Sequence, residues 1–243
     1  MAGTWENSRH SSSSILRLFG LLGPLTIGAN EDGTISFPAP RLGVQQWREI
    51  EPFVWRNVNG PDRIQVLSQD GRPVMLGLDM APPAAFQPAP AWRSPAWIVP
   101  ALVLAIVSLL ISGLVWPVAA LMRRRFNVSL RYSGRAASIY HASRALHLGV
   151  AVLFVATVAT LIYMASEYES LSSGTDAWLL SLKVVAMVTF VAGLFVSIRD
   201  LVVCWRLRRS WFGRLWSINV TLSCAFLLWI AVIFNFANFS SHY

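Results

Sequence analysis

The chain has 243 residues, of which 55% are hydrophobic and only 13% are charged, and its formal net charge is +8. The charged fraction is about half of that in an average globular protein, which excludes an ordinary soluble domain and predicts an integral membrane protein. The positive charge does not indicate nucleic-acid binding: residues 1–95 hold eight arginines and eight acidic residues, whereas residues 96–243 hold 12 basic and four acidic residues among hydrophobic segments. Basic residues in such positions are explained by membrane orientation rather than by phosphate recognition.

Residues 1–80 have the pattern of a small antiparallel β-rich domain. Turn signals at residues 31–33, 57–60 and 69–71 separate short segments of strand composition, and a serine run indicates one short helix over residues 11–20. The expected strands cover residues 24–30, 34–38, 53–57, 63–68 and 73–79. Because a lone sheet of this size is only marginally stable, we expect it to pack against another surface.

Residues 81–95 contain five prolines. Such a segment predicts an extended linker into the membrane rather than a domain of its own.

Residues 96–238 predict a bundle of four transmembrane helices, so the expected fold class is an α+β membrane protein. The first hydrophobic segment, 96–122, has 27 residues without a charge. As a helix it reaches roughly 40 Å, more than the ~30 Å hydrocarbon core requires. The other expected helices cover residues 147–165, 177–198 and 215–236.

The loops between these helices predict their orientation. Residues 123–146 contain six arginines and no acid, and residues 199–214 contain five arginines and one acid, whereas residues 166–176 contain three acids and no base. The positive-inside rule therefore places both chain ends, and the β-rich domain, on the extracytoplasmic side. An exported domain ordinarily follows an export signal, and residues 1–10 have neither a basic nor an apolar signal region, so we expect such a signal upstream.

Few side chains within the expected spans are candidates for chemistry. Lys183 is the one ionisable residue that these boundaries place clearly inside a span, and it either has a function there or extends to the outer interface near Asp176. His141 and His147 are six residues apart, which puts them on different faces of a helix and does not favour a metal or haem site.

The remaining candidates predict packing. Ser108, Ser112 and Gly113 form a small-residue patch that we interpret as a helix-packing surface. Cys204 and Cys224 differ in expected depth by roughly 10 to 15 Å along their helices, which is too far for a disulfide.

The usual catalytic motifs are absent from the sequence. An S-x-x-K pair is impossible, because the sole lysine is Lys183 and position 180 is Leu180, and no G-x-S-x-G, P-loop, H-E-x-x-H or C-x-x-C motif occurs. We therefore assign no catalytic, cofactor-binding or metal-binding residue, and whether the chain belongs to an enzyme stays open.

Several local segments resemble a known family. They read GTWENSRHSSSS, ANEDGTISF, WREIEPFVWRNVNGPDRIQVL and FQPAPAWRSPAW, and the last leads into a helix that ends WPVAALMRRR. In this order they resemble the C-terminal part of bacterial membrane-linked serine hydrolases of the β-lactamase-related, penicillin-binding-protein-like (CubicO-like) group. The resemblance implies an exported catalytic domain ahead of the β-rich domain and the helix bundle, in the bacterial cytoplasmic membrane.

The family's catalytic motifs do not carry over to this chain. Its S-x-x-K motif is absent, no tyrosine here has asparagine two residues later, and His147-Leu148-Gly149 matches the H-x-G pattern only at the expected cytoplasmic end of the second membrane helix. The catalytic domain of the family would lie upstream, together with the expected export signal.

Two hypotheses of function follow. The first is a non-catalytic membrane-anchoring and accessory portion of such a serine hydrolase, a fragment or one half of a split protein, with the lipid bilayer and a hydrolase domain as partners. The alternative is a stand-alone four-helix sensor or assembly protein whose extracytoplasmic domain binds a ligand or partner. A small enzyme that works through Lys183 or a haem is a third possibility.

Overall fold

The computed structural model describes residues 2–7, 25–39, 43–79, 85–127, 134–166, 173–208 and 210–234. The chain divides into two compact units, Met1–Val99 and Pro100–Tyr243. The first unit is a β-barrel and the second is helical, so the α+β layout expected from the sequence is confirmed.

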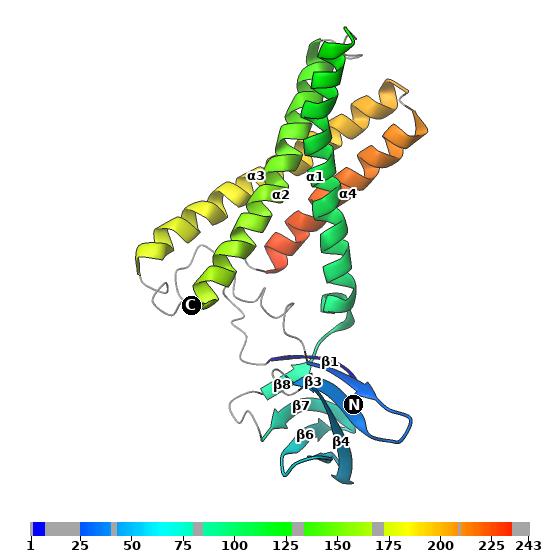
Figure 1. Ribbon diagram of the computed structural model, residues 1–243, viewed down its shortest axis with the longest axis vertical. Coiled ribbons are helices and arrows are strands. Elements are labelled where there is room, and N and C mark those ends of the chain that lie inside the picture. Colours follow the sequence, from blue (N-terminus) through cyan, green and yellow to red (C-terminus); the bar gives the residue numbers. More distant parts are fainter. Residues whose placement is uncertain are drawn as a thin grey trace. The chain divides into compact units, whose positions relative to one another are not determined.

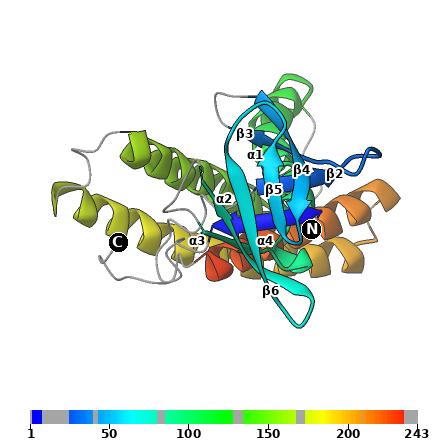
Figure 2. The same cartoon turned by 90° about the horizontal axis from the view of Figure 1, so that it is seen from below.

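Eight antiparallel strands form a closed barrel in which each strand pairs with its neighbours in sequence (Figure 1, Figure 2). The strands are β1 (Gly3–Asn7), β2 (Leu25–Ala29), β3 (Ile35–Ala39), β4 (Gly43–Glu51), β5 (Val54–Asn57), β6 (Arg63–Gln69), β7 (Arg72–Leu78) and β8 (Ala85–Pro88). The last strand pairs with the first, with Trp5 opposite Pro88, and this pairing closes the barrel.

Alternate residues of the strands fill the barrel with apolar side chains. Trp47 is fully buried and its ring stacks on Phe37, with 5.4 Å between the ring centroids. The other members of this core are Trp5, Leu25, Ile27, Ile35, Trp55, Ile64, Val66, Leu76 and Leu78. The period of two between buried and exposed residues is that of strands with one face in a core.

The five expected strands are all present, whereas β1, β4 and β8 were not expected. Strand β8 lies in the segment 81–95 that we expected to be a linker. It pairs with β1 and β7, and Phe86 packs against the core. Because Pro88 ends the strand, its missing N–H does not interrupt the ladder. We expected another surface to cover the edges of the sheet, but closure of the barrel removes those edges. The helix expected over residues 11–20 lies outside the described residues.

The described part of the second unit consists of four long helices. They are α1 (Pro95–Arg125), α2 (Gly134–Ser166), α3 (Ser173–Arg206) and α4 (Trp211–Ile233). The first of them, α1, begins within the barrel unit, which extends to Val99. Each helix is long and apolar enough to cross a membrane, by length and composition. Ser210 caps α4 by accepting a hydrogen bond from the Gly213 N–H at 3.3 Å.

Successive helices of the bundle run in opposite directions (Figure 1). The arginine-bearing end of α1 and the start of α2 therefore lie toward the same end of the bundle as the last residues of α3 and the first residues of α4. Helix α3 packs along both α2 and α4.

Two of the helices are much longer than expected. Helix α2 begins at Gly134 and not near residue 147, and α3 continues to Arg206 and not to residue 198. The expected boundaries followed hydropathy and charge, but residues 134–146 contain no proline and are rich in alanine, so the helix continues through them. The longer helices bring Arg144 and His147 into the body of the bundle.

Candidate functional site: a buried polar network

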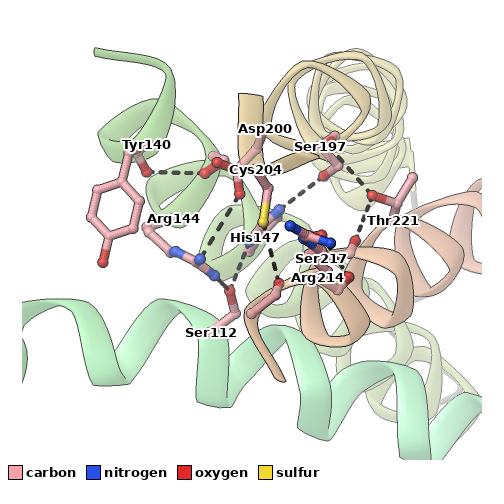
Figure 3. A network of polar contacts seen from close by, with 12 residues as sticks. Ser112, Tyr140, Arg144, His147, Ser197, Asp200, Cys204, Arg214, Ser217 and Thr221 are labelled. Atoms are coloured by element: carbon pink, nitrogen blue, oxygen red, sulfur yellow. Dashed lines mark hydrogen bonds and ion pairs between the residues drawn. The ribbon is translucent and has the colours of Figure 1, made fainter. Parts of the chain in front are cut away.

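Polar side chains from all four helices meet inside the helical unit (Figure 3). Ser112 of α1 lies ten residues before Met122, the last uncharged residue of its segment, which is about 15 Å along the helix. This is roughly half the thickness of a hydrocarbon core. The buried polar residues gathered around this level are Ser112, Ser143, Arg144, His147, Ser197, Asp200 and Ser217.

His147 is the centre of the network and only 1% of its surface is exposed. Its Nδ1 atom lies 2.9 Å from Ser112 Oγ on α1, and its Nε2 atom lies 2.8 Å from Ser197 Oγ on α3. One imidazole on α2 therefore joins three helices.

The donors and acceptors of this chain determine which nitrogen of His147 carries the proton. Arg144 Nη1 donates to Ser112 Oγ, so the Ser112 hydroxyl has its own hydrogen left to donate to His147 Nδ1. Ser197 Oγ donates to the Gly193 carbonyl oxygen at 2.7 Å and so accepts from His147 Nε2. Every group is satisfied when the imidazole is neutral and protonated at Nε2.

An ion pair lies beside the imidazole. Arg144 Nη2 and Asp200 Oδ2 are 3.9 Å apart, and the two side chains are 10% and 8% exposed. The Arg144 guanidinium also lies 5.1 Å from the centroid of the Tyr140 ring. A buried charge is costly without its partner, so removal of either residue is expected to destabilise the contact between α2 and α3.

Helix α4 joins the network through hydroxyl and thiol groups. Cys224 Sγ lies 3.4 Å from Ser197 Oγ, and Thr221 Oγ1 lies 3.4 Å from the Ser197 carbonyl oxygen. Near the same level, Asn219 Nδ2 donates to Ser108 Oγ of α1 at 2.9 Å. These contacts make the network common to all four helices.

Helices α1 and α2 approach each other closely at Gly113. A Cβ atom at Gly113 would lie 2.8 Å from Leu148 Cβ and 3.3 Å from Leu148 Cα. Trp116 Nε1, one turn further along α1, donates to His141 Nδ1 at 3.0 Å. The interpretation of the small-residue patch as a helix-packing surface is therefore confirmed.

The sequence predicted that Lys183 is the one ionisable residue clearly inside a span, and this prediction is wrong. Arg144, His147 and Asp200 are also buried, because α2 and α3 are longer than expected. Lys183 itself is 4% exposed. The side chain of Asp176 lies outside the described residues, so the proposed reach toward it stays a prediction.

The structure does not bring the two central histidines together. His141 contacts Trp116, whereas His147 contacts Ser112 and Ser197. The H-x-G match at His147 lies 13 residues after the start of α2 and not at a helix end. Among the described residues, no group of three or more histidine, cysteine or acidic side chains has a geometry that could hold a metal ion. The thiols of Cys204 and Cys224 are both free and buried.

The arrangement does not form a hydrolytic triad. In such a triad an acid orients the imidazole while the other ring nitrogen takes a proton from serine. Here the Asp200 carboxylate is paired with Arg144, and both ring nitrogens of His147 contact serine hydroxyls. The network is instead suited to fixing the helices in one register, because Ser112, His147 and Ser197 find their partners across helix boundaries.

A sequence signal for this network exists at i, i+3 spacing. Arg144 and His147 are three residues apart on α2, and Ser197 and Asp200 are three residues apart on α3, so each pair occupies one helix face.

Comparisons with known protein families, curated proteins and solved structures gave no match.

Proposed function

We propose that this chain is the membrane-anchoring and accessory portion of a serine hydrolase of the β-lactamase-related group. The barrel is held on the extracytoplasmic side of a bacterial cytoplasmic membrane, and the helices cross that membrane four times. The hydrolase domain supplies the catalytic residues, because this chain contains no catalytic motif of that group.

The observation that carries the proposal is the joint between the barrel and the start of α1. Strand β8 ends at Pro88, the 3-10 helix η2 (Ala91–Arg93) follows, and α1 begins at Pro95. Within this unit Arg93 Nη2 lies 2.5 Å from Glu6 Oε1 of β1, and Ala89 N donates to the Thr4 carbonyl oxygen at 2.9 Å.

The first turn of α1 continues this joint. Trp97 Nε1 donates to the Ala91 carbonyl oxygen at 3.1 Å, and Ile98 is fully buried. These contacts lie within the unit Met1–Val99 and tie its last residues to the barrel. The barrel and the first turn of α1 therefore belong to one folded unit, which suits a module that anchors an attached domain.

Two further observations support the membrane part of the proposal. The four helices have the length and composition of spans, and their arginine-rich ends lie toward one end of the bundle. Ser112, Arg144, His147 and Ser197 hydrogen-bond to one another inside the helices, as polar side chains within a lipid-embedded bundle do.

Orientation is tested by proteolysis from either side of the membrane. We expect a glutamate-specific protease, added to spheroplasts, to cut at Glu167 and Glu169, whereas trypsin leaves Arg123, Arg124 and Arg125 intact. Inverted vesicles should give the opposite result. Trypsin cleavage at residues 123–125 in intact spheroplasts would contradict the proposed topology.

The link to a hydrolase is tested in two steps. The reading frame immediately upstream of Met1 should encode S-x-x-K and Y-x-N motifs, whereas a stop codon followed by an independent promoter would favour the stand-alone sensor or assembly protein.

The encoded hydrolase domain, expressed as a separate tagged polypeptide, should then co-purify with the full chain from solubilised membranes. It should not co-purify with a chain that lacks residues 1–95. The matched control is the membrane fraction, in which both chains should be present at equal amounts. Equal recovery of the hydrolase with both chains would refute the accessory role of the barrel.

A further inference from the structure

Three arginines lie in one row across the outside of the barrel. Arg48 of β4 is directly opposite Arg56 of β5, and Arg56 is directly opposite Arg63 of β6. Figure 2 shows these three strands side by side. All three side chains are exposed, and the sequence neighbours Trp47, Trp55 and Ile64 point into the core.

This row brings like charges together. Directly opposite residues have Cβ atoms only about 4.5–5.5 Å apart, and like charges in such pairs are destabilising. The row is not a consequence of excess charge, because residues 1–95 contain as many acidic residues as arginines.

The nearby carboxylates make no direct ion pair with the row. Asp32 is close enough to Arg48 for the two charges to attract, which offsets part of the positive charge at that end of the row, and its Oδ1 atom accepts hydrogen bonds from Thr34 N and Oγ1 at 3.0 and 2.6 Å. Glu49 Oε1 accepts from the Phe53 N–H at 3.2 Å. Among the described residues, the ion pairs of the barrel unit do not include Arg48, Arg56 or Arg63.

The row borders a hollow in the barrel surface. The hollow has a volume of about 420 Å³, and its lining residues are Arg48, Ile50, Arg56, Asn57, Val58 and Gly60. The hollow is open on its outer side, so it can receive one group of a larger ligand rather than enclose a whole molecule. The guanidinium groups supply charge at one side, and the side chains of Ile50 and Val58, each 47% exposed, supply apolar surface.

The wall of the hollow is fixed by its own hydrogen bonds. Asn57 Oδ1 accepts from the Asn59 N–H at 2.8 Å, and Asn57 Nδ2 donates to Gln45 Oε1 at 3.1 Å. Val58 N donates to the Gln46 carbonyl oxygen at 2.9 Å. A turn that is held in this way needs little ordering when a ligand binds.

We propose that this hollow is a binding site for a phosphate group that carries an apolar portion, as in the headgroup region of an anionic phospholipid. Arg48 and Arg56 bind the phosphate oxygens, because two adjacent guanidinium forks match the geometry of that group. Ile50 and Val58 contact the apolar portion, and Arg63 extends the positive field beyond the hollow. The site does not depend on the association with a hydrolase.

The test uses the full chain in a neutral detergent, with binding of a short-chain phosphatidylglycerol measured by titration calorimetry. The double variant Arg48→Gln/Arg56→Gln should raise the Kd at least tenfold. The matched control is Arg72→Gln, which removes one exposed arginine of the barrel outside the row and should change the Kd less than twofold. Because the helical unit also carries basic residues, the difference between these variants isolates the contribution of the hollow.

Competition distinguishes the sources of the phosphate. Displacement of the lipid by millimolar inorganic phosphate would identify a free phosphate as a sufficient ligand, whereas displacement by lipid alone would identify the headgroup with its apolar portion. Phosphatidylcholine of the same chain length should bind more weakly than phosphatidylglycerol.

A measurement of thermal stability shows whether the double variant is still folded. Removing like charges from the row should leave the Tm of the double variant unchanged or higher. Binding by the double variant equal to that of the unmodified chain, at an unchanged Tm, would overturn the proposal.

Discussion

Replacement of Gly113 by alanine should separate α1 from α2 and disconnect the polar network. The new Cβ atom would meet Leu148 Cβ at 2.8 Å, and carbon atoms pack at about 3.5–4.0 Å, so α1 must move by roughly 1 Å. The same movement lengthens the Ser112–His147 bond from 2.9 Å to a distance at which little of it is left. Overpacking costs about 1–3 kcal/mol and each lost hydrogen bond about 1 kcal/mol, so we expect a loss of about 2–4 kcal/mol in the free energy of unfolding.

The chain offers a matched control for this substitution. A Cβ atom at Gly149 of α2 would meet Thr189 Cγ2 at 3.5 Å, an ordinary van der Waals distance. Gly149→Ala should therefore be neutral or stabilising, by up to about 1 kcal/mol from helix propensity. Both variants are compared by unfolding of the purified protein in mixed micelles with increasing denaturing detergent. Equal unfolding midpoints for the two variants would refute the close approach of α1 and α2.

Three further predictions concern the ion pair, a hairpin and acid stability. Arg144→Gln and Asp200→Asn should each lower the free energy of unfolding by about 3 kcal/mol, and the double variant should lower it by less than the sum of the two. If the two effects add in the same unfolding assay, the pair is not coupled. Gly71→Ala should destabilise the barrel by about 1 kcal/mol because Gly71 has φ +73°, whereas Gly77→Ala, with no atom within 4 Å of the new Cβ, should not. Equal thermal midpoints for these two variants would contradict the turn conformation. Hydrogen bonds from a threonine hydroxyl and backbone hold the pKa of Asp32 below its usual 3.8, so this carboxylate contributes stability above pH 3.8 that is lost as the pH falls through the lowered pKa. Asp32→Asn should flatten the acid limb of the barrel's stability curve below pH 3.8, and an unchanged limb would exclude this contribution.

The parts of the barrel that the sequence predicted are those with local signals. Asp70 and Gly71 have φ of 53° and 73° and form the two-residue turn between β6 and β7, as an Asp-Gly pair indicates. Strands β1 and β8 lack such a signal, because each depends on a partner more than 80 residues away, as Trp5 and Pro88 show. Closure of the sheet depends on both segments together and cannot be predicted from either segment alone.

The candidate site was missed for a different reason. Hydropathy places a helix boundary where charges begin, so Arg144 fell outside the expected second span although its helix begins ten residues earlier. The small patch at Ser112 and Gly113 was recognised, because small residues indicate close packing regardless of boundaries. Its partners His147 and Leu148 lay within the expected second span, but the sequence alone does not show which helix faces the patch.

The pairing of β1 with β8 has a consequence for synthesis. As the chain leaves the ribosome, its opening strand stays without one of its two neighbours until residues 85–88 have emerged, and the hydrophobic helix α1 follows only seven residues later. Completion of the barrel and emergence of α1 therefore fall at nearly the same moment. Any shorter nascent chain exposes unpaired strand edges.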